Sequence, residues 1–355
     1  MVQVRELSAC TSCLLRKHNR IVGEEDDGYS LGFGLRHREV FGTPTRGTFR
    51  GNEVLWQGGR RTDRFGPVLR VTNRGDNFTY AATVEVRKDF GETFGLRVGY
   101  SLTRSADLQN LTSIDITSNF ASTPVNVHPN VPVRQSSRFD RPEKWVASAH
   151  ARILPRFGGT EISLVYVGKS GVPYSYVYMG DVNGDDFPGT RTSSLSNDLI
   201  YITDAIGGFP GSFASRDLWH SLYNLEPCLQ RQTIRILARN TCRTPWSNQV
   251  DLRVSQGIAV RGLSADLSLD LLNVLNLLHS WWGIVHVVNP TVQVFEVRRF
   301  PDPGLASIPV LRARYIGAVQ RDRLTGAVEA ALPYVPEVPT SQWRAQMGVR
   351  LRMAR

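Results

Sequence analysis

The sequence predicts an all-β protein, specifically a portion of an antiparallel transmembrane β-barrel with long extracellular loops. The first observation behind this prediction is a strict alternation of apolar and polar residues over long segments. Because the side chains of a strand point alternately to opposite faces, each such segment has one apolar and one polar face. The second is that short and long connections alternate between these segments, which is typical of outer-membrane barrels.

Six segments carry the alternation most clearly: residues 80–89, 94–103, 144–154, 249–256, 264–271 and 343–353. In the last of them Trp343 and Leu351 share one parity, whereas Arg344 and Arg350 share the other. Several segments have the length of about 9–11 residues with which a tilted strand crosses a bilayer. A soluble antiparallel sheet with one solvated face would produce a weaker version of the pattern.

The connections differ sharply in length. Residues 90–93, 155–159 and 260–262 make short turns, and the turn at 155–159 leads into a seventh strand at 161–168. Long polar connections cover residues 104–143 and 169–248, although compact domains seldom have loops above about 15 residues. If residues 284–315 add two strands, the last strand ends on the short-turn side.

Residues 269–278 fit either an amphipathic helix or a strand that runs into a turn. The alternation in the preceding residues favours the strand.

Arginine supplies nearly all of the positive charge. The chain has 42 Lys+Arg against 32 Asp+Glu and a formal net charge of +10. Arginine suits nucleic acid and phosphate, so a soluble basic all-β protein that binds polyanions or nucleic acid is the alternative hypothesis. A binding patch would cluster arginines with exposed aromatic residues. Here they alternate with apolar residues, which favours a barrel lumen and no nucleic-acid partner. The predicted lumen-lining residues are Arg87, Arg97, Arg152, Arg253, Arg344, Arg350 and Arg352.

Other protein classes are excluded by composition and motif. The 41% of hydrophobic residues is too high for a disordered chain. Nucleophile-elbow, zinc-protease and Walker motifs are missing from the sequence, so no enzyme activity is expected. The N-terminus has no charged segment followed by an apolar core, so no secretory signal is expected. We expect residues 1–27 to be irregular and residues 28–355 to form the partial barrel.

A cluster of oxygen-bearing side chains follows position 180. Asp181, Asn183, Asp185 and Asp186 are ligand types that suit calcium. Their spacing is not that of an EF-hand loop, and a turn built by Asn, Gly and Asp is the favoured alternative. Calcium at residues 181–186 is the one cofactor that the sequence suggests.

Two further features lie in the longest loop. If that loop is extracellular, a disulfide between Cys228 and Cys242 would close about 15 residues and contribute roughly 3 kcal/mol. Tyr174, Tyr176 and Tyr178 have two-residue spacing. They would stack on a ligand or, in the favoured interpretation, lie in the aromatic girdle at a strand end.

Short motifs in a fixed order resemble those of Oar-like TonB-dependent receptors over residues 80–355. The motifs are GYSLTRSAD at 99–107, RFDRP at 138–142, SGVPYSY at 170–176, DLLNVLNLL at 270–278 and WRAQMGVRLR at 343–352. In that family the fold is a 22-stranded outer-membrane barrel with a plug inside. The resemblance implies uptake of a bulky nutrient, driven by a periplasmic coupling protein and the inner-membrane proton gradient.

The matches cover only the C-terminal part of such a receptor, and no plug or coupling box is recognised. The resemblance therefore implies the C-terminal barrel portion of a receptor in the bacterial outer membrane, not competent for transport alone. Its partners would be outer-membrane lipid, the plug and the N-terminal half of the barrel. The TonB coupling protein would act only through those parts.

Overall fold

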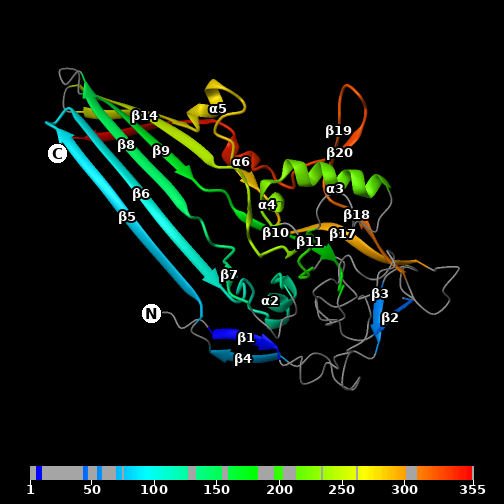
Figure 1. The fold of residues 1–355 in the computed structure, drawn as a ribbon. Helices are drawn as coiled ribbons and strands as arrows, with labels where there is room; N and C mark the ends of the chain where they lie inside the picture. Colours follow the sequence, from blue (N-terminus) through cyan, green and yellow to red (C-terminus); the bar gives the residue numbers. More distant parts are fainter. Residues whose placement is uncertain are drawn as a thin grey trace.

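The computed structural model describes residues 5–9, 43–46, 54–57, 69–73, 76–126, 133–153, 159–182, 196–202, 213–232, 235–260, 263–300 and 310–353. Long strands form one sheet, here called the main sheet, and the connections at one end of it fold into a second region, the cap (Figure 1). The described fold is mostly antiparallel β-structure with few helices, which confirms the all-β prediction.

The main sheet consists of seven long antiparallel strands and the short β7 (Gln135–Ser136), which pairs with β6. The long strands are β5 (Phe78–Phe90), β6 (Phe94–Asp107), β8 (Glu143–Ile153), β9 (Thr160–Lys169), β14 (Ser247–Val260), β15 (Leu263–Leu272) and β22 (Arg344–Met353). Their spatial order is β22-β15-β14-β9-β8-β6-β5. All seven strands predicted from the sequence are present, and β5 and β22 are the two edges of this open sheet.

The register between strands decides which side chains share a face. In β5, β6 and β8, Arg97 stands opposite both Arg87 and Ser148. In β8 and β9, Arg152 stands opposite Glu161. Directly opposed residues of an antiparallel pair point to the same side, so these charged residues lie on one face of the sheet.

The same face continues through the rest of the sheet. Glu161 pairs with Ser255 in β14, and two residues away Arg253 pairs with Asp270 in β15. Asp266 of β15 then pairs with Arg350 of β22. The main sheet therefore has one polar face and one apolar face across all seven strands.

The connections alternate in length, as the sequence predicts. Residues 91–93, 154–159 and 261–262 join strands at one end of the main sheet. Residues 108–142, 170–246 and 273–343 join them at the other end. The third long connection corrects one expectation, because β17 (Thr291–Phe300) and β18 (Val310–Tyr315) are not strands of the main sheet. They pair with each other, and β17 pairs in parallel with β10 (Pro173–Met179).

The cap has its own hydrophobic core around a four-stranded sheet in the order β13 (Cys242–Arg243), β10, β17, β18. The helices α3 (Phe213–Leu225) and α4 (Pro227–Gln230) belong to the same region (Figure 1). The side chain of Trp219 is 1% exposed and packs against Phe295. Core residues come from two long connections, so the cap is a folded unit and not a set of separate loops.

Smaller elements complete the described structure: β1 (Arg5–Ala9) with β4 (Leu69–Asn73), β2 (Thr43–Arg46) with β3 (Val54–Gln57), β11 (Tyr201–Ile202) with β12 (Arg235–Ile236), β16 (His286–Val287) with β21 (Val335–Pro336), β19 (Val319–Arg321) with β20 (Val328–Ala330), and the helices α2 (Ile116–Ser122), α5 (Val274–Leu278) and α6 (Val338–Ser341). Strand β1 lies within residues 1–27, for which the sequence predicts irregular structure. Within the described residues, none of the helices has the length and apolarity that spanning a membrane requires.

Buried ion pairs attach the cap to the end of the main sheet. Arg239 is 1% exposed, and its Nη2 donates to Oδ1 of Asp107 at 2.5 Å and to the backbone oxygen of the same residue at 2.6 Å. Arg243 donates from Nη2 to Oδ2 of Asp140 at 2.5 Å. Burial lowers the pKa of the Arg239 guanidinium, and the charge of Asp107 opposes that effect.

Asp107→Ala should destabilise the protein strongly, because it leaves the buried charge of Arg239 without its counter-ion. We expect a loss of about 3 kcal/mol in the free energy of unfolding, against less than about 1 kcal/mol for Asp89→Ala in the exposed pair with Arg87. Denaturant titration followed by tryptophan fluorescence, in a background that keeps only Trp219 and changes the other tryptophans to Phe, measures both. Equal effects of the two substitutions would contradict the conclusion that the Asp107–Arg239 pair attaches the cap to the main sheet.

Candidate functional site

The polar face of the main sheet is the largest surface that the sequence singled out. Arg352 lies on this face by register, opposite Ser264, but its side chain lies outside the described residues. Arg344 begins β22 and shares the parity of Arg350. The predicted lumen-lining arginines are thus brought to one face, which a barrel lumen requires. That the face encloses a lumen stays a prediction.

The arginines of this face are matched by acidic residues. In the described part of the face, ion pairs join Arg87 to Asp89 at 3.0 Å, Arg97 to Glu85 at 3.4 Å, Arg152 to Glu161 at 3.8 Å and Arg253 to Asp270 at 3.4 Å. Exposed pairs of this kind contribute about 0–1 kcal/mol each. Their effect is therefore electrostatic more than structural, since they leave an exposed face with both signs of charge interspersed.

A cavity of about 650 Å³ lies on the polar face toward its short-turn end. Its lining residues are Arg152, Gly159, Glu161, Arg253, Ser255, Gly257, Asp266, Ser268, Gly348, Val349 and Arg350. Glycine and serine make room among the charged side chains, because a Cβ at Gly348 would come within 2.7 Å of the Ser268 hydroxyl oxygen. Since both cations and anions line it, the cavity suits water and polar solutes more than one class of ion.

The apolar face is exposed along its length. Val84 in the edge strand β5 is 67% exposed, and Met347 in β22 is 84% exposed. Trp145 and Leu267 in the interior strands β8 and β15 are also exposed. A sheet in a soluble protein normally buries its apolar face against another layer, and the described residues provide no such layer over these side chains.

The three tyrosines of β10 correct an expectation, because both interpretations placed them at a surface. Tyr174, Tyr176 and Tyr178 are buried in the cap core together with the intervening Ser175 and Val177. Burial of residues 173–178 follows from the strand's position, since β10 has a paired neighbour on each side and contributes to the hydrophobic core of the cap. Their spacing therefore reflects core packing and not a ligand platform or a girdle.

The predicted calcium cluster is described only at its first member. Asp181 is buried, and the amide of the neighbouring Val182 donates to Oδ2 of Asp198 at 3.0 Å. Asn183, Asp185 and Asp186 lie outside the described residues, so calcium at 181–186 stays a prediction.

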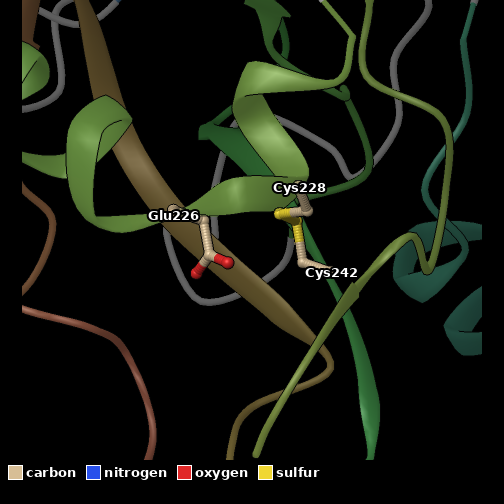
Figure 2. A group of neighbouring side chains, drawn as sticks. All are labelled: Glu226, Cys228 and Cys242. Atoms are coloured by element: carbon tan, nitrogen blue, oxygen red, sulfur yellow. A yellow bond between two sulfur atoms is a disulfide. The ribbon is translucent and has the colours of Figure 1, made fainter.

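Among the described residues, the only group of three side chains that could together hold a metal ion consists of Glu226, Cys228 and Cys242, whose ligand atoms lie within 4.8 Å of one another (Figure 2). The two sulfur atoms are joined in a disulfide with a Cα–Cα distance of 5.2 Å, so neither is a thiolate ligand. The disulfide instead ties α4 to β13 inside the cap.

Glu226 is a buried acid that sequence reasoning missed. Its Oε2 accepts hydrogen bonds from the hydroxyls of Tyr174 at 2.5 Å and Tyr176 at 3.1 Å. Burial raises the pKa of the Glu226 carboxyl, and the two tyrosine hydrogen bonds partly oppose this. Burial also raises the pKa of both tyrosine hydroxyls, so they remain donors. No local sequence signal marks this site, because its partners are about fifty residues apart.

Glu226→Gln should remove a pH dependence of cap stability. Because the folded-state pKa of Glu226 is raised, folding favours its protonated form. That contribution is complete below the unfolded pKa of about 4.3 and is lost as pH rises through the folded-state pKa. The variant should therefore match the wild type near pH 4 and exceed its stability at higher pH. Denaturant titrations of both proteins over a pH series test this. A stability difference between the variant and the wild type that does not change with pH would contradict it.

Compared with known proteins, the chain matches no family model, no curated protein and no solved structure.

Proposed function

We propose that this chain is the C-terminal β-barrel portion of a TonB-dependent outer-membrane receptor for a bulky nutrient. In this proposal the apolar face of the main sheet contacts lipid and the polar face lines a water-filled lumen. The observation that carries it is a seven-stranded sheet whose apolar face is continuous and exposed.

The size of the apolar face supports a lipid environment. Seven strands at about 4.8 Å spacing give a width of about 30 Å, and ten residues at about 3.3 Å give a length of about 30 Å. The resulting area of about 900 Å² exceeds the largest apolar patches of typical soluble monomers, about 300–600 Å². A length of about 30 Å also matches the hydrocarbon core of a bilayer.

The receptor-like motifs gain a physical explanation from their positions, because most of them lie where the long connections meet the main sheet. Asp140 in RFDRP accepts the amide of Ser105 at 2.8 Å and binds Arg243 of the cap. Asn273 in DLLNVLNLL donates to the backbone oxygens of Gly283 and Ser341, both at 2.9 Å. These contacts hold the cap in a fixed position over one end of the sheet, where a ligand would arrive.

In the proposed mechanism the cap and the polar face of the main sheet act in different steps. The cap would contribute to ligand capture, and the hydrated, charge-paired polar face would let a bulky polar solute pass without strong binding to one sign of charge. Plug and coupling steps would come from other parts of a receptor. The proposal also places the chain in the bacterial outer membrane, with lipid as its main partner.

Two neighbouring substitutions of equal chemistry distinguish lipid from water. Val84→Arg and Thr83→Arg alter adjacent exposed residues of β5 that point to opposite faces. In lipid, Val84→Arg should cost about 2–4 kcal/mol and block insertion, whereas Thr83→Arg should be tolerated. Expression with an added export signal, followed by outer-membrane fractionation and carbonate extraction, measures this. If both variants behave alike, or if the wild type is soluble and folded without detergent, the proposal is wrong.

A soluble polyanion-binding protein is the second candidate, and the net charge of +10 favours it. The ion pairs on the polar face reduce the positive field that such binding needs. We therefore expect no retention of the purified chain on heparin above low salt. Retention that weakens steeply with added salt, together with solubility, would favour this candidate instead.

A further inference from the structure

A second surface feature lies beside the apolar face, at the end of the main sheet where the long connections begin. Leu278 is 68% exposed, Trp281 is 77% exposed, and Trp343 is 47% exposed. Leu277 and Trp282 are exposed next to them. These five residues, here called the tryptophan platform, come from helix α5, the turn after it and the residue before β22. Helix α5 projects beside the cap-side end of β14 (Figure 1).

We infer that the tryptophan platform is an interfacial anchor, seated at the headgroup level of a lipid bilayer. This inference rests on the proposed function, because it needs the adjoining apolar face to be in lipid. It assigns a separate role to residues outside the strands, which is to fix the depth of β15 and β22.

Hydrogen bonds hold the platform in place although its side chains are exposed. Nδ2 of Asn276 donates to the backbone oxygens of Ser280 at 3.0 Å and Trp282 at 3.2 Å. Oδ1 of Asn276 accepts the amide of Trp343 at 3.4 Å. One asparagine therefore joins the helix, the turn and the start of β22, so the indoles are presented by a built structure.

The level of the platform along the strands agrees with an interface. Trp145 is paired with Tyr100 and Gly168 in one row of the sheet, and Asn248 extends that row to β14. Trp343 continues the apolar parity of β22 beyond Ala345, close to the same level. Tyr100 and Trp145 are in ring contact, with centroids 4.6 Å apart. Aromatic side chains of β6, of β8 and of the residue before β22 therefore lie near one level at the edge of the apolar face.

The chemistry of the platform fits lipid headgroups better than water or hydrocarbon. Residues 274–285 contain no Asp, Glu, Lys or Arg, and their polar side chains are those of Asn276, His279 and Ser280. An indole has an apolar ring and one N–H donor, so tryptophan prefers the boundary between headgroups and acyl chains. The uncharged polar side chains suit the same layer, and the platform is continuous with the apolar face.

Tryptophan fluorescence with brominated lipids tests the inference. Three variants retain one tryptophan each, at position 281, 219 or 145, with the others changed to Phe. Each is inserted into phosphatidylcholine vesicles brominated either near the carbonyl end or near the methyl end of the acyl chains. Trp281 should lose most emission with bromine near the carbonyl end. Trp145 should be quenched as a positive control for insertion, and buried Trp219 should not be quenched.

The outcomes separate the two proposals. Quenching of Trp145 without quenching of Trp281 would overturn the anchor and leave the proposed function intact. Trp281 shielded from both lipid bromine and aqueous acrylamide would mean that a protein partner or a second copy covers the platform, which also overturns it. No quenching of Trp145 or Trp281 would contradict the proposed function itself.

If the single-tryptophan chains do not fold, two variants of the otherwise native chain test the inference instead. In the otherwise native chain, Trp281→Phe with Trp282→Phe should remove a large share of the carbonyl-end quenching, whereas Trp219→Phe should increase the quenched fraction. The reverse order of these two effects would overturn the anchor.

Discussion

The fixed register of seven alternating strands is the constraint on which the rest of the structure depends. Because the side-chain period of a strand is two residues, a shift of one residue in any pairing would move its arginines to the apolar face. Short turns help to set that register. The turn between β5 and β6 has three residues, and its Gly91 adopts φ 63°, which glycine tolerates without strain. Both proposed surfaces, the lipid-facing and the hydrated, follow from this one alignment.

The strand order adds a constraint on any larger assembly. Six antiparallel steps separate β5 from β22, so the two edge strands run in the same direction. A closed antiparallel barrel alternates strand direction all the way round. Any such barrel that includes this sheet must therefore contain an odd number of strands beyond these seven, and a second copy in the same orientation would meet it with parallel edges.

The cap contrasts with the main sheet in how it is stabilised. Its core is conventional, but it also buries Glu226, Arg239 and the disulfide of Cys228 and Cys242. A buried ionisable group is costly unless it is paired or hydrogen-bonded, and here Glu226 and Arg239 each have partners from a distant segment. The long connections could otherwise adopt many conformations, and these pairings favour one of them.

By itself the sequence determined the strands, their two faces and the alternation of connections, because these depend on neighbouring residues and a period of two. It also indicated the pairing of Cys228 with Cys242, and the tertiary structure places their sulfur atoms in a disulfide. Only the tertiary structure decided which strands β10 and β17 pair with. Their parallel pairing joins segments more than a hundred residues apart. The same holds for the buried partners of Glu226 and for the exposed indoles beside α5. Burial and long-range contact depend on how the connections fold over one another, and no local pattern of residues encodes that.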